Sequence, residues 1–260
     1  MNLFIKNRKD QNIYVVVEEV KNSKGLVFMM HGAGGNTKKT ILQFCKKIFL
    51  KNNISCVLFD TTTTFGESDG NYEDSTITNY FKDLDDVISW AKKQSFYKEP
   101  YYLVGHSLGG ITIILRAIKK PKEVKTIFPI APIVSGELFL NYKFGDEKLK
   151  KWKEQGFLEW YSKSSERIKK LNYTYVKDAK KYDLLAIAHK IKTPTHLFVG
   201  DKDVSTPPKH IKLLFDKLTC KKTFDVIKDM PHAPKTETGL EIFKEKLSEY
   251  ISDSKEVLVK

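Results

Sequence analysis

Three side chains in this 260-residue sequence have the types and the chain order needed for nucleophilic catalysis: a serine, an aspartate and a histidine. A serine hydroxyl attacks poorly until a base takes its proton, and an imidazole base needs a carboxylate to hold its tautomer. The serine is Ser107, in Gly105-His106-Ser107-Leu108-Gly109. Residues 101–104 before it read as a short apolar strand, and residues 111–118 after it are apolar at helical spacing. The pattern predicts a strand, a sharp turn with the serine at its apex, and a helix.

This turn would also help to stabilise an oxyanion. The backbone N–H of Leu108 begins the expected helix and has no partner within it, so it can donate to a developing negative charge. Gly-x-Ser-x-Gly alone is a weak signal, because residues 66–70 repeat it. Four threonines separate that second copy from its strand and no apolar helix follows it, so we interpret it as a surface turn.

His232 is the best candidate for the base, because it alone among six histidines lies in a loop after the last expected strand. The other five histidines lie elsewhere. His106 is beside the serine, His31 is in a glycine-rich loop, His210 is within an expected helix, and His189 and His196 flank or occupy other elements. Asp201 and Asp203 both fit the acid by spacing. Asp203 is preferred because the acid sits a few residues past its strand, where the loop turns back towards the histidine; Asp201 would then be a turn residue.

Apolar strands alternate with amphipathic helices through most of the chain, which predicts a parallel sheet covered on both faces. An antiparallel pair is expected within residues 2–20. The expected later strands are 25–30, 54–59, 101–104, 124–130, 193–199 and 223–227, and the expected helices include 38–51, 208–218 and a final one ending near residue 253. Residues 1–135 and 191–260 would form this core.

Alternation stops between residues 136 and 190, where the chain is helix-like and rich in aromatic residues. Such an insertion is too long for a simple connection, so we expect a cap or lid over the site. Its aromatic side chains are candidate walls of a substrate pocket. The residues that we predict to line this pocket are Phe139, Phe144, Trp152 and Trp160. At least half of its aromatic residues are expected to pack the cap onto the core instead.

The composition of the chain limits the classes of binding partner that we expect. Hydrophobic residues make up 41% and the net charge is +13, but the lysines are scattered and no basic block reaches five residues, so we expect no nucleic-acid partner. The three cysteines are widely spaced and predict neither disulfides nor a metal site. No segment approaches the length of a membrane span, which favours a soluble, cytoplasmic protein. Oligomeric state is left open, with a homodimer among the alternatives.

The whole chain resembles the α/β-hydrolase superfamily, and in particular its soluble carboxylesterase and feruloyl-esterase-like branch, which is also similar to serine aminopeptidases and monoglyceride lipases. The resemblance is carried by residues 31–35 (His-Gly-Ala-Gly-Gly), 66–70, 105–110, 131–132, 200–203 and 231–232. It implies an α/β fold with a mostly parallel eight-stranded sheet, helices on both faces and a helical cap.

The resemblance also implies a triad of Ser107, Asp203 and His232, and an oxyanion hole formed by the N–H groups of Ala33 and Leu108. The implied activity is hydrolysis of short-to-medium acyl or aromatic esters, with a small-molecule ester as substrate and with no cofactor and no metal. Ala33 replaces a bulkier residue often found there, and Pro-His replaces a common Gly-His pair. The alternatives are a thioesterase, a peptidase or amidase, a monoacylglycerol lipase, an acyl transferase, or a basic binding protein without catalysis.

Overall fold

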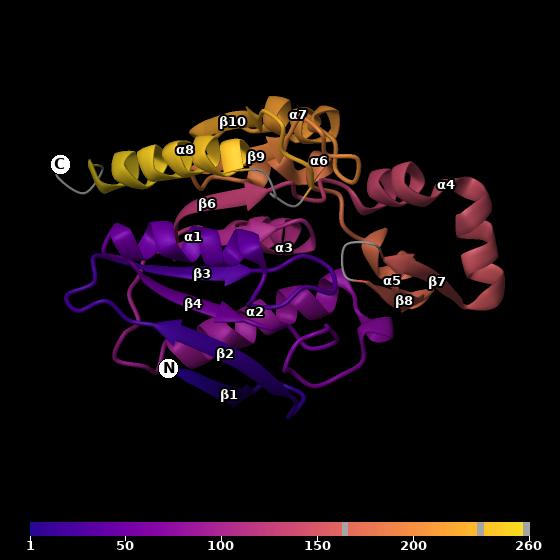
Figure 1. Ribbon diagram of the computed structural model, residues 1–260, viewed down its shortest axis with the longest axis horizontal. Coiled ribbons are helices and arrows are strands. Elements are labelled where there is room, and N and C mark those ends of the chain that lie inside the picture. Colours follow the sequence, from indigo (N-terminus) through magenta and orange to yellow (C-terminus); the bar gives the residue numbers. More distant parts are fainter. Residues whose placement is uncertain (163–165, 233–236, 257–260) are drawn as a thin grey trace.

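The computed structural model describes residues 1–162, 166–232 and 237–256. Within these residues the main sheet has eight strands, in the order β1-β2-β4-β3-β5-β6-β9-β10 (Figure 1). They are β1 (Asn2–Lys6), β2 (Asn12–Glu18), β3 (Leu26–Met30), β4 (Ser55–Phe59), β5 (Tyr101–His106), β6 (Val124–Ile130), β9 (Thr195–Gly200) and β10 (Lys222–Ile227). β2 pairs antiparallel with β1 and β4, and the other neighbours are parallel. The expected mostly parallel sheet and its N-terminal antiparallel pair are confirmed.

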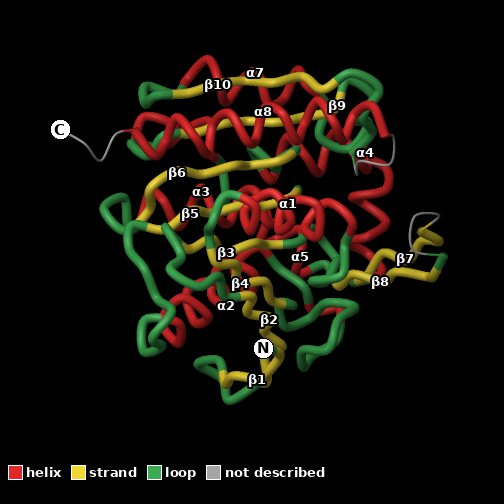
Figure 2. The backbone as a smooth tube through the Cα atoms, turned by 60° about the vertical axis from the view of Figure 1, so that its left-hand side comes forward, coloured by secondary structure: helices red, strands yellow, loops and turns green. Residues whose placement is uncertain are grey.

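Helices cover both faces of the main sheet (Figure 2). One face carries α1 (Thr40–Lys51) and α8 (Glu237–Glu256), and the other carries α2 (Ile77–Ala91), α3 (Leu108–Lys119) and α7 (Pro208–Lys217). Strand β3 is buried throughout, with Phe28 in one hydrophobic core and Met29 in the other. Because successive side chains of a strand point to opposite faces, a strand covered on both sides must be apolar throughout.

The carboxyl ends of the parallel strands meet at one edge of the sheet, and the candidate catalytic residues follow them. Ser107 comes directly after β5, Asp203 follows β9, and His232 follows β10. In Figure 1 this edge faces the segment that carries α4, β7 and β8. Side chains far apart in the sequence are therefore brought together where open α/β sheets bind their ligands.

The insertion between residues 136 and 190 is only partly helical. It contains α4 (Gly136–Gln155), α5 (Thr174–Ala179), α6 (Leu184–Ile187) and the short helix η2 (Ala188–Lys190). It also contains an antiparallel hairpin of β7 (Phe157–Ser162) and β8 (Arg167–Asn172), which the sequence interpretation did not foresee. Exposure alternates residue by residue along most of β7, the pattern of a strand with one covered face. Gly156 ends α4 in the left-handed conformation (φ 79°) that favours glycine.

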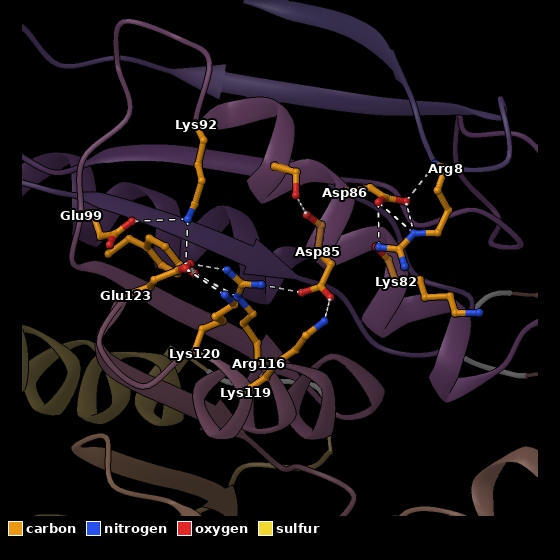
Figure 3. Close-up of polar contacts among 12 residues, drawn as sticks. Arg8, Lys82, Asp85, Asp86, Lys92, Glu99, Arg116, Lys119, Lys120 and Glu123 are labelled. Carbon is orange, nitrogen blue, oxygen red and sulfur yellow. Dashed lines mark hydrogen bonds and ion pairs between the residues drawn. The ribbon is translucent and has the colours of Figure 1, made fainter.

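A buried arginine ties α2 to α3 beneath the sheet (Figure 3). Arg116 Nη1 lies 2.7 Å from Asp85 Oδ1, and its other terminal nitrogen contacts Glu123. The Arg116 side chain is only 6% exposed, so the two carboxylates supply the charge that burial requires. Where this chain buries a cation to support the fold, it therefore places acidic side chains beside it.

His196 on β9 gives the fold a defined sensitivity to acid. Its ring stacks between Phe128 and Tyr250, and Nδ1 contacts Thr223 Oγ1 at 2.9 Å. Burial first, and then the nearby Lys221, lowers the His196 pKa from 6.5 to about 4. As the pH falls below 6.5, His196 therefore becomes protonated in the unfolded chain but stays neutral in the folded chain until about pH 4. The free energy of unfolding decreases through that pH window.

A His196→Phe variant is accordingly expected to lose less unfolding free energy than wild type between pH 7 and pH 4.5, by up to about 3 kcal/mol. Urea unfolding at the two pH values measures this difference. His189 is exposed, so His189→Gln should keep the wild-type pH dependence. Equal pH dependence in wild type and His196→Phe would contradict the assignment.

Candidate active site

Ser107 occupies the strained turn that the sequence predicts. Strand β5 ends at His106, α3 begins at Leu108, and Ser107 between them has φ 55° and ψ −112°. A side-chain-bearing residue in this conformation costs energy that the surrounding structure must offset. A Cβ at Gly105 would lie 2.3 Å from the Gly109 carbonyl oxygen, so the turn can close only with glycine there. The Ser107 N–H donates to Ile130 O at 2.9 Å, which anchors the turn to β6.

Asp203 and His232 form a direct pair. His232 Nδ1 lies 2.7 Å from Asp203 Oδ2, and the Asp203 side chain is fully buried. The other carboxylate oxygen accepts the N–H groups of Ser205 (2.7 Å) and Thr206 (3.0 Å). Burial raises the Asp203 pKa, but the hydrogen bonds and charge of His232 and these backbone donors outweigh it and leave the pKa lowered. Asp203 is thus held as an anion, which fixes the proton of His232 on Nδ1 and leaves Nε2 free to act as a base.

Asp201, the other acid that the spacing allowed, has a different contact. It is exposed, and its Oδ1 accepts the N–H of Met230 at 3.2 Å. Among the described residues, no hydrogen bond or ion pair joins Asp201 to His232. Asp201 joins the two loops that carry Asp203 and His232, as a turn residue does.

His106 positions the loop of His232, a role that the sequence analysis missed. Its Nε2 donates to the His232 carbonyl at 2.7 Å, and the two rings lie 4.8 Å apart. Burial, followed by the charge of His232, lowers the His106 pKa to about 3, so the ring stays neutral. The only sequence signal for this role is that His106 is next to the serine. Within the described residues no hydrogen bond joins Ser107 Oγ to the His232 ring, and His106 is what connects their two segments. Such catalytic contacts are often long without substrate and tighten when it binds.

The loop after β3 is held so that one of its N–H groups stays available. The Gly32 carbonyl accepts from His31 Nδ1 (2.8 Å), from the Tyr80 hydroxyl (3.3 Å) and from the Gly35 N–H (2.9 Å). The Ala33 N–H belongs to the same planar peptide as that carbonyl and points the opposite way. Among the described residues it has no acceptor. A Cβ at Gly32 would lie 3.1 Å from Ser107 Cβ, so this loop lies against the turn at Ser107.

His31 fixes this loop and is not a base. The Thr61 N–H donates to its Nε2 at 3.1 Å, so the ring proton must be on Nδ1, the atom that contacts Gly32. Burial lowers the His31 pKa, which keeps the ring neutral.

The second Gly-x-Ser-x-Gly copy has a structural role. The Ser68 hydroxyl donates to Asp60 O at 2.6 Å and accepts the Tyr14 N–H at 2.8 Å. The first contact closes the loop of residues 60–74 on itself, and the second fastens it to β2 of the main sheet. Only the short 3₁₀ helix η1 (Tyr72–Asp74) follows Ser68, and no apolar α-helix begins at this turn.

The four aromatic residues proposed for the pocket do not behave alike. Trp152 is fully buried, its Nε1 donates to Leu171 O at 2.9 Å, and its ring stacks on Tyr175. It therefore packs the insertion together and offers no wall to a ligand, which corrects that choice. Phe139, Phe144 and Trp160 are partly buried, and the Phe144 ring centre lies 6.3 Å from that of Phe139 and 6.5 Å from that of Trp160.

The insertion is fastened to the core near the site. Thr78 at the start of α2 contacts Asp178, which accepts its N–H at 2.9 Å. Lys143 of α4 donates to Ser205 Oγ at 3.0 Å, two residues from Asp203. The described residues contain no cluster of histidine, cysteine or acidic side chains that could hold a metal ion. They also contain no helix long and apolar enough to cross a membrane.

Comparison with known proteins decides the family. The profile of the serine aminopeptidase S33 family matches residues 21–239, which is most of the chain. The chain belongs to that family. It is accordingly a serine hydrolase of the α/β-hydrolase superfamily.

Curated relatives of this S33 hydrolase include the mitochondrial palmitoyl-protein thioesterase ABHD10 of Bos taurus, 29% identical over 189 residues, and that of Homo sapiens, 30% identical over 190 residues. Each alignment covers 71% of this chain and 58% of the relative, so the chain spans less than two thirds of their length. Among solved structures, Est1E of Butyrivibrio proteoclasticus with bound ferulic acid superposes with a TM-score of 0.84 at 20% identity, covering 97% of this chain and 98% of that one. The mouse ABHD10 structure gives 0.81 at 21% identity, covering 97% and 99%. These superpositions show the shared fold.

Proposed function

We propose that the chain is a carboxylic-ester hydrolase that works through an acyl-enzyme on Ser107. The observation that carries the proposal is the strained Ser107 turn together with the pair of partly exposed His232 and buried Asp203. A conformation that costs energy at a serine, next to a histidine whose tautomer is fixed, is what nucleophilic catalysis needs and what a structural turn does not.

In the proposed mechanism His232 Nε2 takes the proton of the Ser107 hydroxyl as Oγ attacks the acyl carbonyl. Asp203 stabilises the imidazolium that forms, and His232 then returns the proton to the leaving group. Water enters by the same route and releases the acid. His106, through its bond to the His232 carbonyl, holds the base in place while the proton moves.

The N–H groups of Ala33 and Leu108 form the proposed oxyanion hole. The Gly32 carbonyl is bound on its far side by three donors, so the Ala33 N–H is oriented before substrate arrives. Leu108 is the first residue of α3, where the helix leaves N–H groups unpaired and its dipole favours negative charge. Donors that need not reorganise lower the barrier most.

The insertion of residues 136–190 acts as the cap in this proposal. Phe139, Phe144 and Trp160 are its candidate walls for an acyl or aromatic group, and the contact between Lys143 and Ser205 links cap position to the loop of Asp203. The proposed substrates are small-molecule esters with short-to-medium acyl chains or aromatic acids.

A thioesterase is the second candidate, because the curated relatives are named palmitoyl-protein thioesterases. A thioester needs the same nucleophile, base and oxyanion hole, so the site serves both reactions. That name also places the relatives in mitochondria, whereas our expectation for this chain remains the cytoplasm. The homodimer and the lack of a nucleic-acid partner also stay predictions.

Rates on matched esters, thioesters and anilides of one acyl group test the proposal, followed by 4-nitrophenyl esters from acetate to dodecanoate. We expect the ester and the thioester to be cleaved and the anilide to be much slower, with a rate maximum at a chain length that the cap accommodates. Preferred cleavage of the anilide would overturn the esterase proposal in favour of a peptidase. No cleavage of any substrate would overturn the hydrolytic mechanism.

A further inference from the structure

Three basic side chains gather beside the loop after β3. Arg167 and Lys169 come from β8, and because they are two residues apart in a strand they face the same side. The Arg167 guanidinium carbon lies 4.7 Å from the centre of the Phe65 ring, and Lys169 Nζ lies 5.8 Å from the same centre. Lys39, the residue before α1, lies at the end of that loop, and its charge helps to lower the Lys169 pKa. We call Lys39, Arg167 and Lys169 the cationic cluster.

The aromatic pair beneath the cluster lies against the proposed oxyanion loop. The Phe65 and Tyr72 ring centres are 4.4 Å apart, and Lys169 Nζ is 5.6 Å from the Tyr72 centre. A Cβ at Gly34 would lie 2.9 Å from Tyr72 and 3.0 Å from Phe65, so both rings pack directly on Gly34. Gly34 follows Ala33, so these rings lie between the two β8 cations and the loop that carries the N–H that we assign to the oxyanion hole.

The cationic cluster has no acidic partner among the described residues. Burial first, and then the charges of Lys39 and Arg167, lowers the Lys169 pKa to about 8. By contrast, Lys170, the next residue of the strand, pairs with Glu73 at 3.0 Å. Lys39 and Arg167 are exposed, but Lys169 is partly buried, and a partly buried cation beside two like charges is costly unless something supplies the opposite charge.

A structural role explains the cationic cluster poorly. Where a buried cation supports the fold, as at Arg116, carboxylates of this chain surround it (Figure 3). The rings of Phe65 and Tyr72 attract the two β8 cations, but such contacts leave the outer side of each cation without a partner. That outer side is where an anion would bind.

We propose that the cationic cluster binds a carboxylate or phosphate group of the substrate while Ser107 attacks the acyl carbonyl. The inference rests on the proposed function and narrows its substrate class to anionic esters or thioesters. Arg167 offers paired donors that match an oxyanion, and Lys169 adds a point charge. The aromatic rings below keep water from one side, which strengthens both interactions.

Substrates matched in length and differing in charge test this inference. On the acyl side we would compare 4-nitrophenyl hexanoate with mono-4-nitrophenyl adipate and with 4-nitrophenyl 6-phosphonooxyhexanoate. On the leaving-group side we would compare 4-acetoxybenzamide with 4-acetoxybenzoate. The ratio of kcat/KM for anionic over neutral substrate should exceed one in at least one comparison, and the favoured comparison tells which group and which side of the ester the cluster binds.

Lys169→Gln and Arg167→Gln should each lower that ratio about tenfold, the worth of a charge-assisted hydrogen bond in a partly dry site. Lys170→Gln is the matched control, because it removes the same charge from the other face of the same strand and should leave both the ratio and the basal activity unchanged. Raising the salt concentration should reduce the ratio in wild type and have less effect on the two cluster variants.

Failure of the inference and failure of the proposed function give different results. If wild type cleaves neutral esters but shows no charge preference in any comparison, or if Lys170→Gln lowers the ratio as much as Lys169→Gln, the cationic cluster is not a substrate site. If no ester is cleaved, binding of adipate mono-anilide and of neutral hexananilide to Ser107→Ala decides the inference without catalysis. Tighter binding of the anion, lost in Lys169→Gln, would support the inference, and equal binding would overturn it.

Discussion

Ser107→Ala is expected to lower kcat/KM for esters by at least about a thousandfold, which is the scale on which serine hydrolases lose rate without their nucleophile. The methyl group of alanine cannot form the acyl-enzyme, and the remaining rate would come from the N–H groups of Ala33 and Leu108 acting on bound substrate. Binding of a non-hydrolysable analogue should change little, because the variant removes one atom. Initial rates with 4-nitrophenyl esters measure the loss.

The chain carries its own control for this variant. Ser68 occupies the other Gly-x-Ser-x-Gly copy, and its hydroxyl bonds only to the backbone of Asp60 and Tyr14. Ser68→Ala should therefore cost stability, at about 1 kcal/mol for each lost hydrogen bond, and should leave the chemistry of the folded enzyme intact. A Ser107→Ala protein that is folded and still cleaves esters at the wild-type rate would refute the mechanism.

Asp203→Asn should lower kcat by up to about ten-thousandfold, the scale seen when the acid of a serine triad is made an amide. The Asp203 oxygen that accepts the Ser205 and Thr206 N–H groups must remain an oxygen in the variant. The new amide nitrogen then faces His232 Nδ1 and donates to it, which moves the imidazole proton to Nε2. His232 in that tautomer cannot take the proton of Ser107.

Asp201→Asn is the matched control for this second variant. This substitution makes the same change of charge in the same loop. Asp201, however, accepts the Met230 N–H, and an amide oxygen can accept that bond as well. Its activity should stay close to wild type. The lost activity of Asp203→Asn should recover partly at high pH, where hydroxide can replace the missing base. Near-wild-type activity of Asp203→Asn at pH 7 would contradict the proposed role of the pair.

Local patterns predicted the parts of the site that a short stretch of chain determines. The glycines at 105 and 109 predicted the turn, because only residues without side chains fit there. The alternation of strands and helices predicted that the loops after β5, β9 and β10 would share one edge, and so that Asp203 and His232 could meet. The positioning role of His106 was missed because its partner is the backbone carbonyl of residue 232. No sequence pattern encodes such a contact between distant segments.

Contacts within the insertion could not be predicted in the same way. The hairpin of β7 and β8 was overlooked because its aromatic content was interpreted as a helical cap. The outward-facing Phe157 and Tyr161 are aromatic as well, so β7 alternates in exposure but not in its sequence. Trp152 was chosen as a pocket wall by residue type alone, and only its packing on Tyr175 shows that it is internal. The cationic cluster joins β8 to Phe65 and Tyr72, about a hundred residues earlier, so it emerges only in three dimensions.

The central claim is that Ser107 is a nucleophile activated by His232, and covalent labelling with a fluorophosphonate tests it most directly. After brief reaction at pH 7, peptide mass spectrometry should find the phosphonyl adduct on Ser107, with none on Ser68. The labelling rate should fall sharply in His232→Gln, because the hydroxyl then has no base. An adduct on another residue, or labelling of Ser107 at the same rate in His232→Gln, would contradict the account.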